Sequence, residues 1–267
     1  MTTVLLAHGA GGGIQANYAG LIEALSPDYT ILGLDLPGTG GAPRRPDPLT
    51  LDGLADELVA AADGHDRFTI VGYSLGTALA IRAATRHPDR VDALVLTAPF
   101  AKPNPRFTLL VKLWRELLGT DQIAAFVHLI GLGADSLDRI GEAELTESLA
   151  ASIPPPGTPD HLDLIDTIDV RADLARIAVP TLVISTTQDN LVTPYHHREV
   201  AQGIKQAQYA ELAAGHLPFV ETPQEWIGLI RSFLEDQARA TPSASAAAVT
   251  AAATAGATRS SKGDGMM

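Results

Sequence analysis

Short apolar runs of strand length alternate with stretches of helical periodicity along most of the chain. Strands are expected near 3–7, 29–35, 68–73, 91–96, 180–185 and 207–212, and helices near 14–25, 50–62, 75–87, 195–204 and 223–238. Because strands that alternate with helices usually pair in parallel and are covered on both faces, the pattern predicts an α/β fold with a mostly parallel, doubly wound sheet.

The alternation stops between Pro99 and Pro180, where only helical periodicity remains. Two apolar stripes have i, i+3, i+4, i+7 spacing, and they consist of Phe107, Leu110, Val111, Trp114, Leu117 and Leu118, and of Ile123, Phe126, Val127 and Ile130. Leu109, Leu113 and Leu129 lie outside these stripes. A helix that is apolar on more than one face must bury the second face too, either against the rest of the protein or around a ligand.

The last segment, 239–267, has a different composition. It consists almost entirely of Ala, Thr, Ser and Gly. Such a segment cannot bury enough apolar surface to offset the entropy lost on ordering, so we expect it to be disordered.

Composition narrows the classes of function. A chain of 267 residues that is 46% hydrophobic can bury one large core, and a net charge of −12 disfavours nucleic acid as a partner. No segment has the pattern of a signal peptide or the length of a membrane span, which predicts a cytoplasmic protein. Because the chain has no cysteine, it has no disulfide, thiolate metal site or cysteine nucleophile.

The pentapeptide Gly72-Tyr73-Ser74-Leu75-Gly76 lies between an expected strand and an expected helix. A G-x-S-x-G motif in this context is typical of a nucleophile elbow, a sharp turn that exposes a serine hydroxyl at the end of a parallel strand. Glycines on both sides of the serine relieve crowding in such a turn. The motif alone is also found in turns with an inert serine, so its weight depends on the rest of the chain.

Other motifs give that support. The first strand ends in His8-Gly9 and a glycine run, another strand precedes Asp189, and Gly215-His216 follows near the end. With the elbow serine, these features occur in the order serine, acid, histidine. At these points the chain resembles the α/β-hydrolase superfamily, and the resemblance covers nearly all of residues 1–236.

The resemblance implies a set of site residues. Ser74 would be the nucleophile, His216 the base and Asp189 the acid that orients it. The oxyanion hole would use the backbone N–H groups of Ala10 and Leu75. The resemblance also implies that the helical segment forms a cap with an apolar pocket over Ser74. The candidate substrate-binding residues of this pocket are Trp114, Leu113, Phe126 and Leu129.

Competing residues have simpler interpretations. His8 is interpreted as a loop organiser, and His87 as a residue at a helix C-terminus. The remaining histidines are read as surface or cap-packing residues, and these are His65, His128, His161, His196 and His197. Near-helical spacing suggests a solvated helix face for Asp163, Asp166, Asp169 and Asp173. The glycine run lacks the spacing of a nucleotide-binding loop.

The expected organisation is a hydrolase core over 1–98 and 170–238, a helical cap over 99–169 and the tail over 239–267. The family's N-terminal β-hairpin is expected to be missing, since few residues precede His8. The strand near 29–35 would then form a sheet edge that needs a cover, and a homodimer, the cap or the tail could supply one.

These observations predict a serine hydrolase that needs no cofactor or metal and cleaves an ester, lactone or thioester of a mostly apolar small molecule. One alternative is a natural-product biosynthetic enzyme, such as a thioesterase, a cyclase or a C–C bond enzyme, on the same scaffold. Another is a non-catalytic ligand-binding protein with this fold. Fold and motif do not separate these chemistries.

Overall fold

The computed structural model describes residues 1–240, which divide after Arg231 into two units. The centre of the first unit is a six-stranded sheet in the order β2-β1-β3-β4-β5-β6, in which every neighbouring pair is parallel. The strands are β1 (Thr2–Ala7), β2 (Tyr29–Leu34), β3 (Phe68–Tyr73), β4 (Val91–Thr97), β5 (Thr181–Thr186) and β6 (Ala207–Leu212). The predicted parallel α/β sheet is confirmed.

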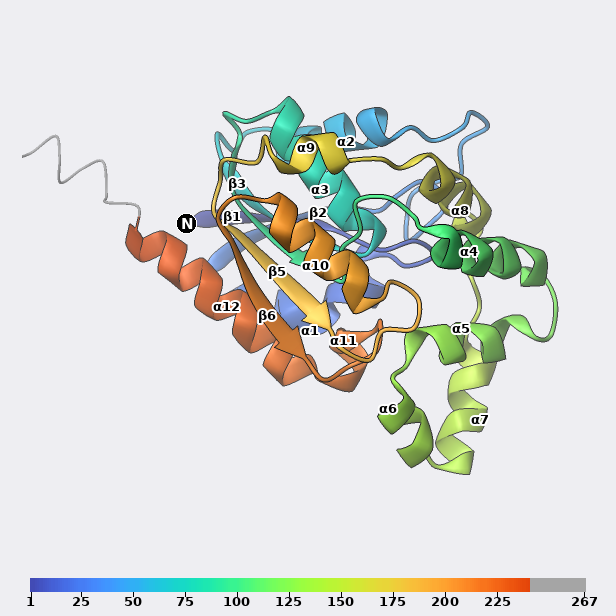
Figure 1. Ribbon diagram of the computed structural model, residues 1–267. Coiled ribbons are helices and arrows are strands. Elements are labelled where there is room, and N and C mark those ends of the chain that lie inside the picture. Colours follow the sequence, from blue (N-terminus) through green and yellow to red (C-terminus); the bar gives the residue numbers. More distant parts are fainter. Residues whose placement is uncertain (241–267) are drawn as a thin grey trace, which may run out of the picture. The chain divides into compact units, whose positions relative to one another are not determined.

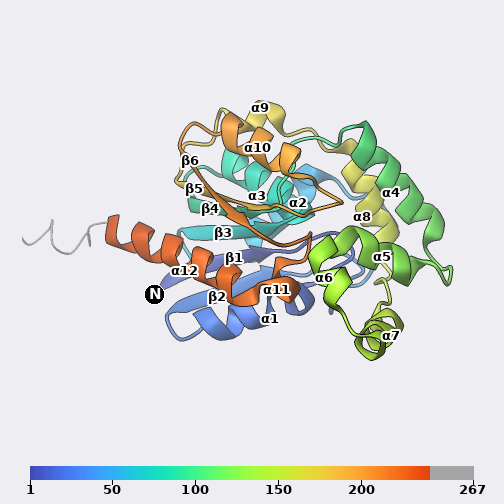
Figure 2. The ribbon, with the colours of Figure 1, turned by 60° about the horizontal axis from the view of Figure 1, so that its bottom comes forward.

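Helices cover both faces of this sheet (Figures 1 and 2). The helices α2 (Leu51–Ala60), α3 (Leu75–Arg86), α9 (Arg171–Leu174) and α10 (Pro194–Gly203) lie on one side. On the other side lie α1 (Ile14–Leu25) and the first turns of α12 (Pro223–Ala240), preceded by the short α11 (Pro218–Glu221). Trp226 is buried there, stacks on Tyr18 and donates a hydrogen bond from Nε1 to Thr97 Oγ1 at 3.0 Å.

The helices that follow β4 lie beyond the carboxyl ends of the strands, up to the one before α9 (Figure 2). These helices are α4 (Pro105–Leu117), α5 (Ile123–Gly131), α6 (Ala134–Arg139), α7 (Glu142–Ala151) and α8 (Thr158–Thr167). Asn104 starts α4 because its side chain accepts a hydrogen bond from the Phe107 N–H, and Pro105 suits the first helical position. We call α4 to α8 the cap helices below.

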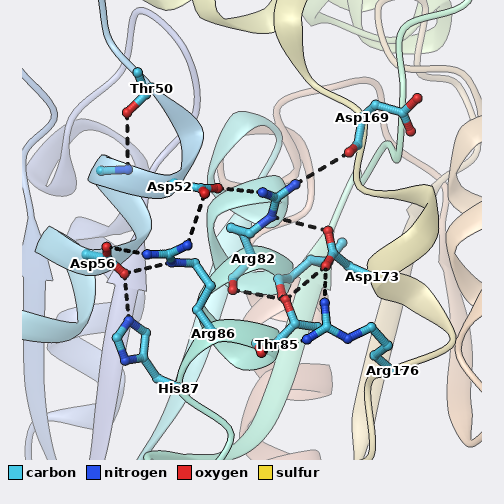
Figure 3. A network of polar contacts seen from close by, with 12 residues as sticks. Thr50, Asp52, Asp56, Arg82, Thr85, Arg86, His87, Asp169, Asp173 and Arg176 are labelled. Carbon is cyan, nitrogen blue, oxygen red and sulfur yellow. Dashed lines mark hydrogen bonds and ion pairs between the residues drawn. The ribbon is translucent and has the colours of Figure 1, made fainter.

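An ion-pair network joins α2, α3 and α9 on one face of the sheet (Figure 3). Arg86 binds both Asp52 and Asp56, and Arg82 binds Asp52 and Asp173. Asp173 is only 6% exposed, so this carboxylate does not belong to a solvated face as the sequence suggested. His87 follows the last residue of α3, as expected, and its ring bonds Asp56 at 2.7 Å.

Strand β2 lies at one edge of the sheet, next to β1, as predicted. Within residues 1–240 no antiparallel hairpin strand joins the sheet. The helices of the described residues include none with the length and hydrophobicity of a transmembrane segment. The homodimer proposed for this edge stays a prediction. The sequence predicts a disordered tail over 239–267. Arg239 and Ala240 are helical, as the last residues of α12, and the rest of that segment lies outside the described residues.

Candidate active site

Ser74 occupies the turn between β3 and α3, in a backbone conformation that residues other than glycine rarely adopt. Its φ is +52°, in the left-handed region. A Cβ at Gly76 would overlap the carbonyl oxygen of Ala7 in β1, and one at Gly72 would lie 2.7 Å from the carbonyl oxygen of Gly76. The two glycines therefore let β3, the turn and α3 approach closely enough to hold the serine in this strained position.

Three predicted side chains form one hydrogen-bonded chain. The Ser74 hydroxyl lies 2.9 Å from His216 Nε2, and His216 Nδ1 lies 2.7 Å from Asp189 Oδ2. All three residues are at most 5% exposed. Because a carboxylate only accepts hydrogen bonds, Nδ1 carries the imidazole proton and Nε2 is left to accept the serine proton.

Asp189 is held by four donors. Its Oδ1 accepts the N–H groups of Leu191 and Val192 at 2.9 and 2.8 Å, and its Oδ2 accepts Thr186 Oγ1 at 3.0 Å as well as His216. A second buried imidazole, His197, has its Nε2 3.8 Å from Asp189 Oδ2. Burial lowers the pKa of His197 to about 4, so near neutral pH this ring brings no charge to the carboxylate.

The loop after β1, residues 9–13, forms one wall of the cavity that Ser74 and His216 line, and we call it the glycine loop. It lies beside Ser74 because β1 and β3 are neighbours, and the chain reverses its direction of winding between them. Ligands of open α/β sheets bind at such a switch point. Within residues 1–240 the backbone N–H groups of Ala10 and Leu75 donate no hydrogen bond, so both remain available to an oxyanion.

His8 is a buried organiser of this wall, as its sequence context suggested. Its Nε2 accepts the Leu36 N–H at 2.9 Å, which requires Nδ1 to carry the proton and donate to Gly9 O at 2.7 Å. Burial lowers the pKa of His8, which agrees with a neutral ring. Asn17, which no sequence motif marks, accepts the Gly9 N–H at 3.2 Å and lines the cavity.

A cavity of about 120 Å³ opens above Ser74 between the glycine loop and the cap helices. Its apolar lining consists of Phe107, Trp114, Val127, Ile130, Ile165, Leu191 and Leu217. Trp114 is therefore placed as predicted. Phe126 does not line the cavity; it is half-buried and packs against the hydrophobic core.

Besides Phe126, two more candidate pocket residues, Leu113 and Leu129, lie outside the cavity. Leu113 is 43% exposed and Leu129 is 62% exposed, and neither lines the cavity; Leu109 is also exposed. The stripes themselves face the site, through Phe107 and Trp114 on α4 and Val127 and Ile130 on α5. The leucines outside the stripes face solvent, where single apolar side chains are common.

The loop that carries His216 is fixed to the cap by Glu221. Its Oε1 accepts the Gly215 N–H at 2.9 Å, and its Oε2 accepts the Gly133 N–H at 3.0 Å and the Ser136 hydroxyl at 2.6 Å. The Leu217 N–H also donates to Gly131 O at 3.1 Å. The position of His216 therefore depends on where the cap meets the core.

The competing carboxylates pair with basic side chains, and three of the competing histidines are buried. His161, His196 and His197 are at most 1% exposed, so they are not surface residues. Asp163 and Asp166 on α8 bind Arg115, and Asp169 binds Arg171 and Lys102. Within the described residues no group of three His, Asp or Glu side chains is arranged to hold a metal ion.

Comparison with known proteins agrees with this architecture. A pyrrolizixenacetamide deacetylase from Xenorhabdus hominickii is 34% identical over 239 residues, 86% of this chain and 90% of that protein. A pimeloyl-[acyl-carrier protein] methyl ester esterase from Neisseria meningitidis serogroup B is 29% identical over 88% of this chain and 94% of its own length. The crystal structure of the enol-lactonase from Burkholderia xenovorans LB400 has a TM-score of 0.78, with 26% identity over 88% of this chain and 91% of that one.

The family comparison is equally broad. Residues 4–229 match the model of the alpha/beta hydrolase family, which spans the sheet, the cap helices and the loops around Ser74. The chain therefore belongs to the alpha/beta hydrolase family, and its relatives are hydrolases.

Proposed function

We propose that the protein is a cofactor-independent serine hydrolase that cleaves an ester, lactone or thioester of a mostly apolar small molecule. The observation that carries this proposal is the continuous hydrogen-bonded chain from Ser74 Oγ through the His216 imidazole to Asp189 Oδ2, with distances of 2.9 and 2.7 Å. A serine hydroxyl is a poor nucleophile unless a positioned base takes its proton, and this chain supplies that base.

The reaction follows from these positions. Ser74 Oγ attacks the substrate carbonyl carbon while its proton passes to His216 Nε2, and Asp189 stabilises the imidazolium that forms. The N–H groups of Ala10 and Leu75 bind the oxyanion. When the tetrahedral intermediate collapses, His216 returns the proton to the leaving group. Water, activated by the same imidazole, then attacks the acyl-enzyme and releases Ser74.

The cavity favours a small acyl group. The cavity above Ser74 is small, with a volume of about 120 Å³. Phe107, Trp114 and Ile130 provide apolar walls. We therefore expect acetyl to butyryl esters to be better substrates than long-chain esters.

Amide deacylation is a second candidate reaction, because the Xenorhabdus hominickii relative at 34% identity is named as a deacetylase of an acetamide. The same residues serve both reactions, but an amine is a poorer leaving group and needs the proton from His216 as the C–N bond breaks.

Hydrolysis of p-nitrophenyl acetate, butyrate and octanoate, with p-nitroacetanilide alongside, tests both reactions. Each assay is paired with fluorophosphonate labelling of the wild type and of Ser74→Ala. We expect turnover of short esters, and labelling that disappears in the variant. Labelling without turnover of any ester or amide would favour the biosynthetic alternative, and absence of labelling would favour a binding protein and overturn the proposal.

A further inference from the structure

His161 connects the cap to the glycine loop. It lies in the second turn of α8 and is fully buried. Its Nδ1 accepts the N–H of Gly11 at 3.2 Å, and its Nε2 lies 3.1 Å from the carbonyl oxygen of Pro37. One side chain of the cap thus bonds the loops that follow β1 and β2.

The backbone fixes which nitrogen carries the proton. The Gly11 N–H can only donate, so Nδ1 must be an unprotonated acceptor, and the Pro37 carbonyl can only accept, so Nε2 must carry the hydrogen. Burial, and then the neighbouring His8, lower the pKa of His161 to about 4. The neutral ring with hydrogen on Nε2 is therefore the form present at neutral pH.

Gly11 follows Ala10, whose N–H is proposed above to bind the oxyanion. Gly11 has φ +64°, and a Cβ there would lie 3.2 Å from Thr158 Oγ1. Thr158 and His161 are one helical turn apart, so α8 contacts this residue through two side chains. The Gly9 end of the loop is held separately, by His8 and Asn17. Ala10 therefore lies between two anchored residues, and the anchor on its far side is His161.

Helix α8 is itself firmly attached to the core. The Gly157 N–H donates to Gly38 O at 2.9 Å, and Arg44 binds Asp160 through Nε and Nη2 at 2.6 and 2.9 Å. A Cβ at Gly38 would overlap the backbone of Gly157, so the two segments are in direct contact. His161 is thus presented from a fixed base and can hold the glycine loop in place.

We propose that His161 is a positioning residue for the oxyanion hole, which sets the direction of the Ala10 N–H through its hydrogen bond to the Gly11 N–H. The inference rests on the proposed hydrolase function. Through His161, the cap would help to position the oxyanion hole in addition to forming a wall of the pocket. Loss of the bond lets residues 10–12 relax away from the oxyanion, so the transition state loses stabilisation while substrate binding is little changed.

Two substitutions separate the two hydrogen bonds of this ring. His161→Asn keeps an acceptor oxygen at the position of Nδ1 and loses the donor to Pro37. His161→Gln keeps a donor near the position of Nε2 and loses the acceptor for Gly11. We expect His161→Gln to lower kcat about 10- to 100-fold with KM within about twofold, and His161→Asn to retain most of kcat. Inhibition by a trifluoromethyl ketone, whose adduct carries an oxyanion, should weaken in parallel with kcat.

His128→Gln is the matched control. This half-buried cap histidine bonds Ala124 O and Ser148 Oγ, which joins α5 to α7, and it does not touch the glycine loop. It should lower thermal stability without changing kcat or inhibition. Equal kcat in His161→Asn and His161→Gln, or a loss in both that follows their melting temperatures, would overturn the proposal.

Two further measurements keep the outcomes distinct. A long-range ¹H–¹⁵N spectrum of the wild type should show His161 with its proton on Nε2, and a proton on Nδ1 would overturn the inference without any variant. If the wild type neither hydrolyses esters nor reacts with fluorophosphonate, the proposed function fails. An active wild type whose kcat is indifferent to His161→Gln would refute only the positioning role.

Discussion

Ser74 and His216 are 142 residues apart in sequence and meet at 2.9 Å in the folded chain. If they act as one unit, Ser74→Ala should reduce kcat on the order of 10⁶-fold, His216→Ala should match it, and the double variant should cost little more. Steady-state kinetics on a p-nitrophenyl ester measures all three. Additive losses in the double variant would show that the two residues act separately.

Gly76 gives a stability prediction at the same scale. A Cβ in Gly76→Ala must displace the backbone of β1 or α3, so we expect a loss of about 3 kcal/mol or more in the free energy of unfolding. Gly228→Ala in α12 is the control, since nothing lies within 4 Å of its added Cβ. That change should stabilise by about 0.5–1 kcal/mol. Denaturant titration compares them; similar effects would contradict the steric argument.

At the scale of elements, α4 and α5 show which face of a cap helix meets the site. Ile130 lines the cavity, while its neighbour Leu129 is 62% exposed. Ile130→Ala should raise KM for an apolar ester roughly threefold to tenfold, because it removes apolar contact with the substrate. Leu129→Ala should leave KM unchanged and alter stability by less than about 0.5 kcal/mol. A larger change in KM for Leu129→Ala than for Ile130→Ala would instead support the sequence prediction that Leu129 binds the substrate.

The difference between Leu129 and Ile130 also shows where sequence patterns stop being informative. Strands such as β3 and β5 were located to within a residue, because they are buried on both faces and read as continuous apolar runs. Ser74, Asp189 and His216 are predicted as a group because each follows a strand at a recognisable motif, and the structure brings their side chains together. The lining of the pocket depends on how each cap helix is rotated about its axis relative to the sheet. The spacing of apolar residues along the helix does not determine that rotation.

His161 was missed for a related reason. Its partners Pro37 and Gly11 are 124 and 150 residues away, and no local motif marks a histidine that will bond two distant loops. Asn17 and Glu221 are similar cases, since each matters through backbone N–H groups of another element. Such residues follow from the packing of elements, which the sequence specifies only collectively.

At the scale of the whole molecule, the buried histidines should make stability depend on pH. Burial lowers the pKa of both His161 and His197 from 6.5 to about 4. Between these values the unfolded chain binds more protons than the folded one, so stability is fully present above about pH 6.5 and is lost as pH falls toward 4. One pKa unit corresponds to 1.36 kcal/mol, so each ring accounts for a loss on the order of 3 kcal/mol in the free energy of unfolding over this pH range.

The carboxylates act in a lower window, which allows the two effects to be separated. Hydrogen bonds from Arg86 and His87 lower the pKa of Asp56 from 3.8 to about 2, so its contribution is lost only below about pH 4. His161→Asn should therefore flatten the fall of the melting temperature between pH 6.5 and 4, and Asp56→Asn should leave that part of the curve unchanged. Thermal unfolding of the three proteins across pH 3–8 measures this. If the His161→Asn curve keeps the full wild-type slope between pH 6.5 and 4, that ring is not held neutral by the fold, and the hydrogen bond assigned to its Nδ1 loses its support.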